Sequence, residues 1–108
     1  MKMSLTKTFT FAAAHKLPNY QGLCRNLHGH EWRLDITVEG EVNKQTGMVV
    51  DFVHFKGIVD HEIIHKLDHT YLNDLIPYPT AELILNWIAI NLPQHLILMG
   101  VKLIKMEL

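Results

Sequence analysis

The sequence predicts a fold of the α+β class, because strand patterns open and close the chain and helix patterns lie between them. Polar and apolar side chains alternate over Leu5–Phe11 and over Trp32–Glu39, as they do in half-buried β-strands. Apolar residues recur at three- and four-residue spacing over Phe52–Leu67, as on the buried face of a helix. With 108 residues, the chain fits a single domain, residues 1–108, that is long enough to enclose a hydrophobic core.

The first strand has a polar and an apolar face and leads toward two candidate functional residues. Its threonines alternate with apolar side chains, and His15 follows just beyond its end. The next segment, Pro18–Gly22, is rich in turn-forming residues and carries Cys24 on its far side. Loops on a rigid scaffold often hold catalytic groups, so this thiol is a candidate.

The second strand carries a histidine pair on its apolar face. His28 and His30 precede Trp32 at a spacing of two, so the three side chains point to the same side. Polar groups on a half-buried face need partners, and a metal ion satisfies several imidazoles at once. His15, His28 and His30, with Cys24 nearby, therefore form the main candidate metal site.

Two helices are predicted in the second half of the chain. A short apolar strand is expected at Met48–Val50, and Asp51 is placed to cap the first helix. The second helix should begin near Pro79–Thr80 and end near Leu92, before Pro93.

The last predicted strand, Met99–Glu107, is partly apolar on both faces. Val101 and Leu103 share one face, and Ile104 and Met106 share the other. This pattern indicates a sheet that is covered on both sides.

Composition narrows the class of partner. The formal net charge is -1, which gives no electrostatic basis for binding nucleic acid or an anionic membrane. The longest apolar run, Leu83–Leu92, is interrupted and too short to span a bilayer, and the threonines near the N-terminus interrupt any signal-like segment. The single cysteine fits a reducing compartment. We therefore expect a cytoplasmic protein.

A second histidine motif, His61–His65, matches H-E-x-x-H, which binds zinc in metalloproteases. With Val59 at the centre of the apolar stripe, both histidines point away from the core, as does His54. We interpret them as a solvated or subunit-facing histidine surface rather than a zinc site.

An adjacent acid and imidazole, Asp68 and His69, follow the same helix. A carboxylate can orient a neighbouring imidazole and stabilise its charged form, which gives a general acid/base pair. Taken alone, however, the pair is better explained as a helix-terminal histidine beside a solvated aspartate.

Five motifs follow one another along the chain. They are Phe-x-Ala-Ala-His ending at His15, Cys-x-x-x-His-Gly-His from Cys24, Gly-Met-Val-Val-Asp-Phe from Gly47, Leu-Asp-His-x-x-Leu-Asn from Leu67 and Pro-Thr-x-Glu from Pro79. In this order they resemble the 6-pyruvoyltetrahydropterin synthase family, and most of all its bacterial 6-carboxy-5,6,7,8-tetrahydropterin synthase branch. The resemblance covers nearly the whole chain.

The resemblance implies a fold and an assembly. The family's fold is the tunnelling T-fold, an antiparallel sheet with two helices packed on one face, and its subunits join their sheets into an oligomeric barrel. We therefore expect a homo-oligomer, a trimer, tetramer or hexamer, with active sites at subunit interfaces.

The resemblance also implies site roles. Zinc is bound by His15, His28 and His30, and Cys24 is the catalytic base. Asp68 and His69 form a dyad that completes proton transfer. Glu107 anchors the pterin, with Thr80 close to the same ring.

The implied activity is that of a zinc-dependent lyase of queuosine biosynthesis, which converts 7,8-dihydroneopterin triphosphate to 6-carboxy-5,6,7,8-tetrahydropterin and releases acetaldehyde and triphosphate. The pyruvoyl-forming and aldolase-like branches of the family share the zinc ligands, so their reactions are alternatives that the sequence does not exclude. A non-catalytic module, with Cys24 as fourth zinc ligand, is a further alternative. The chain stops at Leu108, whereas the family continues with Thr and a short segment, so substrate binding or assembly is expected to be weaker.

Overall fold

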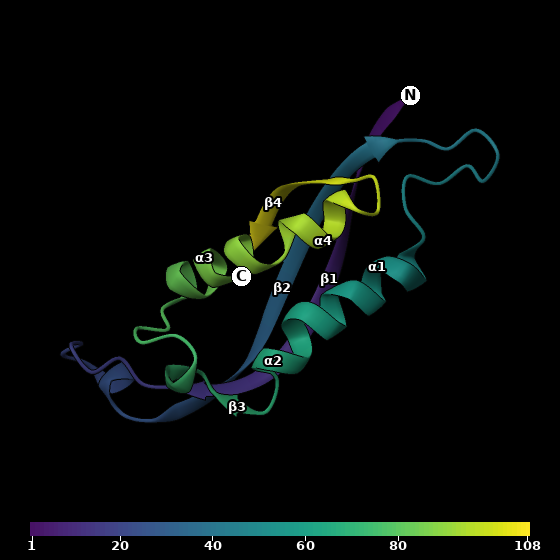
Figure 1. Cartoon of the computed structure of the whole chain (residues 1–108). Helices are drawn as coiled ribbons and strands as arrows, with labels where there is room; N and C mark the ends of the chain where they lie inside the picture. The colour runs from purple at the N-terminus through teal and green to yellow at the C-terminus, as the bar shows by residue number, and fades with distance from the viewer.

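The computed structural model describes all 108 residues and has one sheet with helices on one of its faces (Figure 1). The four strands are β1 (Lys2–His15), β2 (His28–Glu41), β3 (Thr70–Tyr71) and β4 (Lys102–Glu107), in the spatial order β3-β1-β2-β4. β1 and β4 both pair antiparallel with β2, whereas the two-residue β3 runs parallel to β1. The predicted antiparallel sheet is therefore confirmed, with one short parallel strand added at its edge.

The first predicted helix is a continuous helical segment with a change of pitch. It comprises α1 (Phe52–Val59), a π-helical stretch at Asp60–Ile64 and α2 (His65–Leu67). Asp51 caps it as predicted, because its side chain accepts a hydrogen bond of 2.8 Å from the Val53 amide.

The second predicted helix is α3 (Ala81–Asn91), and Thr80 is its N-cap. α3 ends at Asn91 with Leu92 as its C-cap, which confirms the predicted end near Leu92, and a further short helix that was not predicted, α4 (Pro93–Ile97), follows at once. Proline is well tolerated at the first position of a helix, where a backbone N–H would have no intrahelical partner, so Pro93 can start α4.

Two further strand predictions need correction. Met48–Val50 is not a strand, because its hydrogen bonds close a turn: the Asn43 amide donates to the Met48 carbonyl at 2.8 Å. β4 contains an irregularity in its pairing with β2, so that Leu103 lies opposite Val38 and Met106 opposite Ile36. Leu103 and Met106 both pack on the core, and Ile104 is exposed.

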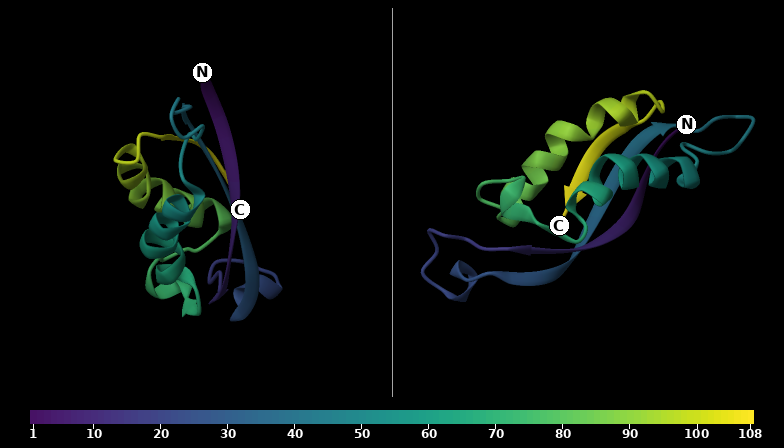
Figure 2. Two further views of the ribbon diagram at one scale, coloured as in Figure 1. Left: turned by 90° about the vertical axis from the view of Figure 1, so that its right-hand side faces the viewer. Right: turned by 60° about the horizontal axis from the view of Figure 1, so that its bottom comes forward.

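The sheet is consequently covered on one face only. The edge-on view shows the helices gathered on one side of the strands (Figure 2). Eighteen buried apolar residues fill the space between these layers, among them Phe11, Leu34 and Phe55. The opposite face is polar, which corrects the predicted two-sided cover within one chain.

The molecule is elongated, with principal extents of 54 × 20 × 19 Å. The paired ends of β1 and β2 run beyond the helices, and the loop that joins them lies at one tip of the molecule (Figure 1). This tip carries the histidines and the cysteine singled out above. None of the helices is long and apolar enough to cross a membrane.

Candidate metal centre and active site

Strand pairing brings the three predicted histidine ligands together. His15 at the end of β1 lies directly opposite His28 at the start of β2, and His30 follows two residues later on the same face. One ring nitrogen from each lies within 4.8 Å of the other two, and no other histidine, cysteine or acidic group joins this cluster. The register of one hairpin therefore builds the cluster.

Trp32 joins the cluster to the hydrophobic core. Its ring centroid lies 5.1 Å from those of both His15 and His30, and its indole nitrogen donates to the Ala13 carbonyl at 3.2 Å. The indole also stacks on the Phe11 ring, with the two ring centroids 6.1 Å apart. Trp32 thus packs against the imidazoles of His15 and His30 and connects them to the core.

Two backbone carbonyls set which ring nitrogens carry protons. His15 Nδ1 lies 2.8 Å from the Pro79 carbonyl, and His28 Nδ1 lies 2.7 Å from the Asn26 carbonyl. A carbonyl can only accept, so both Nδ1 atoms carry the proton and both Nε2 atoms have a free lone pair in the neutral rings. These two Nε2 atoms face each other at 3.0 Å.

The facing lone pairs fit a bound metal ion. Two unprotonated nitrogens at this distance repel each other unless a proton or a cation lies between them. Tetrahedral metal sites with metal–nitrogen distances of about 2.0–2.1 Å separate two nitrogens by roughly 3.3 Å, close to the observed spacing. Metal-binding histidines commonly donate their second nitrogen to a carbonyl, as His15 and His28 do.

The protonation of His15 also favours metal binding. Burial lowers the pKa of His15, and the nearby His28 and His30 lower it further, against an opposing effect of the hydrogen bond to Pro79. The neutral ring, which is the form that binds metal, therefore persists to lower pH than in a free histidine.

Cys24 lies near this cluster in sequence but outside it in space. It is half-buried in a short 3-10 turn, Leu23–Arg25, and its Sγ is not among the clustered ligand atoms. A hydrogen bond of 2.9 Å from the Leu17 amide to the Cys24 carbonyl ties this turn to the end of β1. Three ligands in the cluster leave room for an exchangeable position on a tetrahedral ion.

Asp68 and His69 form the predicted acid–imidazole pair. Asp68 Oδ2 lies 3.0 Å from His69 Nδ1, and Asp68 Oδ1 accepts a hydrogen bond of 2.8 Å from the Ala12 amide. This amide, more than His69, lowers the pKa of Asp68. His69 adopts a left-handed backbone conformation (φ 58°) and points into solvent with 82% of its side chain exposed. Ala12 precedes His15 by three residues, about 10 Å along the strand.

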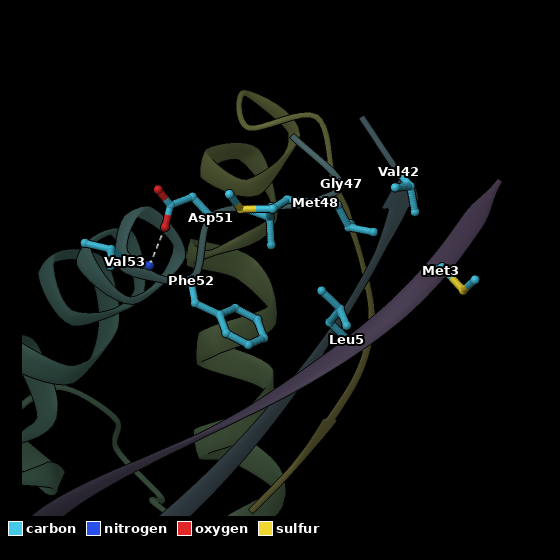
Figure 3. A pocket seen from close by; sticks show the side chains of 10 residues that line it. Met3, Leu5, Val42, Gly47, Met48, Asp51, Phe52 and Val53 are labelled. Atoms are coloured by element: carbon cyan, nitrogen blue, oxygen red, sulfur yellow. Dashed lines mark hydrogen bonds between the residues drawn. The ribbon is translucent and has the colours of Figure 1, made fainter. Parts of the chain in front are cut away.

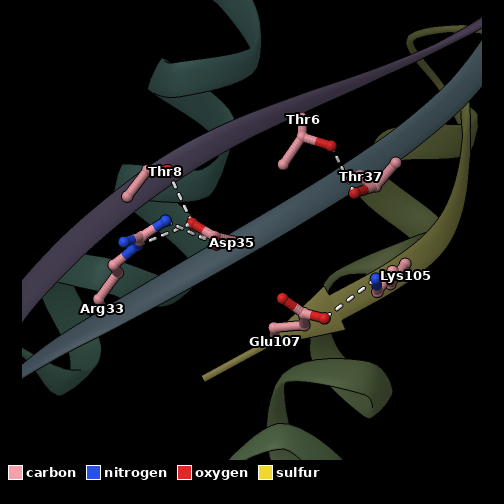
Figure 4. Close-up of polar contacts among 7 residues, drawn as sticks. All are labelled: Thr6, Thr8, Arg33, Asp35, Thr37, Lys105 and Glu107. Atoms are coloured by element: carbon pink, nitrogen blue, oxygen red, sulfur yellow. Dashed lines mark hydrogen bonds and ion pairs between the residues drawn. The ribbon is translucent and has the colours of Figure 1, made fainter.

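The two predicted pterin-binding residues differ in position. Thr80 follows Pro79, whose carbonyl holds His15, so it lies beside the histidine cluster. Glu107 lies opposite Asp35, five residues from His30 and thus roughly 17 Å along β2, on the polar face of the sheet. It pairs there with Lys105 at 3.0 Å (Figure 4). One protomer does not bring Glu107 to the cluster.

The H-E-x-x-H segment has the orientation that the helical pattern predicts. His54, His61 and His65 are exposed. Glu62 accepts from His61 at 2.9 Å and lies 3.3 Å from His95 of α4, so its carboxylate ties two helices together.

The carbonyls of Pro79 and Asn26 are functional groups that sequence reasoning missed. They fix the tautomers of His15 and His28. Because every residue has a backbone carbonyl, no pattern of side chains in the sequence could have identified these two. A pocket of about 460 Å³ with a mostly apolar lining lies elsewhere, beside the loop before α1 (Figure 3). This pocket shares no lining residue with the histidine cluster.

A sheet with helices on one face and a cluster of three imidazoles at its end defines an α+β protein with a candidate metal site. Residues 4–108 match the model of the family described as 6-pyruvoyl tetrahydropterin synthase. The chain belongs to this family, as the five motifs predict.

Named relatives agree with this assignment. The chain is 42% identical over 94 residues to a 6-carboxy-5,6,7,8-tetrahydropterin synthase of Synechocystis, an alignment that covers 82% of this chain and 73% of that protein. It is 37% identical to a dihydroneopterin monophosphate aldolase of Pyrococcus furiosus, over 89% of this chain and 80% of the relative. Two other curated relatives are matched over only 61% and 52% of their own lengths. The family is thus one of enzymes, in keeping with the predicted lyase class.

A solved structure supports the predicted fold. The 6-pyruvoyl tetrahydropterin synthase of Caenorhabditis elegans superposes with a TM-score of 0.78 at 22% identity, covering 87% of this chain and 79% of that one. The tunnelling T-fold expected from the sequence is therefore confirmed.

Proposed function

We propose that this chain is a zinc-dependent lyase that converts 7,8-dihydroneopterin triphosphate to 6-carboxy-5,6,7,8-tetrahydropterin in the cytoplasm, as a step toward the 7-deazaguanine queuosine. Acetaldehyde and triphosphate are released, and one water is consumed overall. The observation that carries the proposal is the pair of facing Nε2 atoms, 3.0 Å apart, in a chain 42% identical to an enzyme of that name.

His15, His28 and His30 would hold the zinc ion. Three neutral imidazoles are a common donor set for catalytic zinc, which when bound supplies a Lewis acid for a substrate hydroxyl or carbonyl. The hydrogen bonds to Pro79 and Asn26 fix two of these rings before the ion arrives, so little reorganisation accompanies binding.

Proton transfer falls to Cys24 and to the Asp68–His69 pair. A thiolate is a competent base for a carbon-bound proton once its pKa is lowered near a cation. Asp68 is itself held by the Ala12 amide, so its carboxylate orients the His69 ring to deliver or remove a second proton. That Cys24 lies outside the cluster of ligand atoms favours the base role over a closed four-ligand zinc module.

Glu107 and Thr80 are proposed to bind the pterin ring. A carboxylate accepts two parallel hydrogen bonds from an amino-pyrimidine edge. Because Glu107 lies on the polar sheet face, a substrate that contacts both Glu107 and the cluster must span this separation or bind between protomers. The outer edge of β4, and the part of the outer edge of β1 that β3 does not cover, would allow sheets of a homo-oligomer, a trimer, tetramer or hexamer, to join.

Product identification tests the proposal. Zinc-loaded protein is incubated with dihydroneopterin triphosphate, and carboxytetrahydropterin with one equivalent of acetaldehyde is the expected outcome. A pyruvoyl product would select the related synthase reaction instead. No turnover by protein with one zinc per chain would support the binding module. Cys24→Ala should bind zinc as the unaltered protein does and lose turnover; full turnover would remove Cys24 from the mechanism.

A second candidate is the aldolase reaction, because the Pyrococcus furiosus relative aligns over 89% of this chain. Dihydroneopterin monophosphate offered in the same assay decides between them. Cleavage of the monophosphate with no reaction of the triphosphate would favour the aldolase.

A further inference from the structure

The segment after α2 runs along the outer edge of β1 beside the histidine cluster. We name Asp68–Asn73 the edge segment. At its start, the His69 amide donates to the Ala12 carbonyl at 2.6 Å, and the Ala12 amide donates to Asp68. The edge segment is therefore hydrogen-bonded to β1 three residues before His15.

The middle of the edge segment is the parallel strand β3. Thr70 lies opposite Ala13, and Tyr71 lies opposite Ala14. Continued by two residues, this register would set Asn73 opposite Lys16. The backbone leaves the ladder instead, because Leu72–Asp74 forms a 3-10 turn.

Asn73 replaces the lost backbone pairing with its side chain. The Lys16 amide donates to Asn73 Oδ1 at 3.0 Å, and Asn73 Nδ2 donates to the Lys16 carbonyl at 2.9 Å. One carboxamide thus satisfies both main-chain groups of Lys16. Of the twenty side chains, only those of asparagine and glutamine offer a donor and an acceptor in this planar arrangement.

Lys16 lies between the histidine cluster and the turn that carries Cys24. It directly follows the candidate ligand His15 and directly precedes Leu17, whose amide binds the carbonyl of Cys24. The hydrogen bonds from Asn73 therefore hold the segment that links the metal cluster to the thiol. The same edge segment carries the Asp68–His69 pair.

We propose that Asn73 is a positioning residue, which fixes His15 and the Cys24 turn relative to the Asp68–His69 pair by completing the hydrogen bonds of Lys16. This proposal rests on the proposed function for its catalytic consequence, and on geometry alone for its effect on the metal cluster. Removing groups that orient metal ligands commonly lowers metal affinity or activity by 10- to 100-fold. A loss in that range is expected for Asn73→Ala.

The matched control is Asn91→Ala. Asn91 is also half-buried. Its side-chain Nδ2 donates a hydrogen bond of 2.7 Å to a single backbone carbonyl, that of Trp87 within α3. Asn73→Asp is the graded variant, since its carboxylate still accepts from the Lys16 amide but no longer donates. Zinc affinity is measured by competition with a chelator, and backbone amide exchange is followed at Lys16.

The expected results form a series. Asn73→Ala should bind zinc 10- to 100-fold more weakly, exchange the Lys16 amide faster and lose kcat with KM nearly unchanged. Asn73→Asp should lie between Asn73→Ala and the unaltered protein in all three measurements. Asn91→Ala should match the unaltered protein in zinc affinity and in exchange at Lys16, whatever its thermal stability.

Two outcomes would overturn the inference. One is an Asn73→Ala protein with unchanged zinc affinity and unchanged exchange at Lys16. The other is an equal loss of zinc affinity in Asn91→Ala, which would mean that any lost amide hydrogen bond has this effect. If the unaltered protein binds zinc but turns over no pterin, the proposed function fails; the zinc and exchange measurements still decide the role of Asn73.

Discussion

Zinc should stabilise this protein through three particular histidines, and removing one of them should abolish that effect. His28 is the informative position, because its Nε2 faces that of His15 at 3.0 Å while its Nδ1 is held by a backbone carbonyl. His28→Ala removes one ligand and leaves the strand pairing of the hairpin in place. A two-ligand remnant binds zinc far less tightly.

The size of the effect follows from binding linkage. Free zinc at 100 times its Kd stabilises a folded protein by about 2.7 kcal/mol. An unfolding entropy of about 2.1 cal/mol/K per residue, over 108 residues, gives roughly 0.23 kcal/mol/K for this chain. The expected rise in Tm is therefore about 12 °C for the unaltered protein and near zero for His28→Ala.

Thermal unfolding with and without zinc, at one protein concentration, measures this shift. His65→Ala is the control, since it removes an exposed imidazole outside the cluster and should keep the full rise in Tm. The reasoning would be refuted by an undiminished shift in His28→Ala, or by a loss of the shift in His65→Ala. Either result would move the main zinc site away from the hairpin.

Three further predictions concern stability. Gly40→Ala should lower the free energy of unfolding, measured in urea, by about 1–3 kcal/mol, because the added Cβ would lie 3.2 Å from the Gly100 carbonyl oxygen. Gly57→Ala is the control: its Cβ would meet no atom, so the change should be neutral or stabilising. Equal effects of the two substitutions would contradict this reasoning. The depressed pKa of Asp68 gives stability that is present above about pH 4 and lost as pH falls through the lower folded-state pKa, so the deficit of Asp68→Asn at pH 7 should shrink at pH 3. Thr80→Ala should lose about 1 kcal/mol through the N-cap of α3 while Thr80→Ser keeps it; a KM increase shared by both would indicate that the threonine methyl contacts the substrate.

Much of the fold could be predicted from the sequence, because alternation and helical spacing report which face of an element is buried. β1 and β2 have the predicted faces, although each extends beyond the predicted bounds. Local patterns fail where a tertiary interaction decides. Strict alternation places Ile104 and Met106 on one face, yet the irregular pairing of β4 with β2 turns Met106 toward the core.

The site was predictable to the extent that its groups are side chains at regular spacing. His28 and His30 share a face by strand periodicity, but the arrival of His15 opposite His28 requires the hairpin register, which the sequence alone does not give. Asn73 is the last residue of the Leu-Asp-His-x-x-Leu-Asn motif, but the motif does not indicate what its side chain binds. Its partner is the backbone of Lys16, 57 positions away, and no pattern of side chains encodes such a contact.

The way in which the cluster is held explains why stability and activity should respond to different substitutions. His15, His28 and Lys16 are each fixed by a hydrogen bond between a side chain and the main chain, at the part of the hairpin that runs beyond the helices. The core beneath α1 and α3 has little part in these contacts, and Trp32 is its main link to the imidazoles. A core truncation such as Phe55→Ala should therefore lower the free energy of unfolding by about 3–5 kcal/mol and leave zinc affinity of the folded protein nearly unchanged.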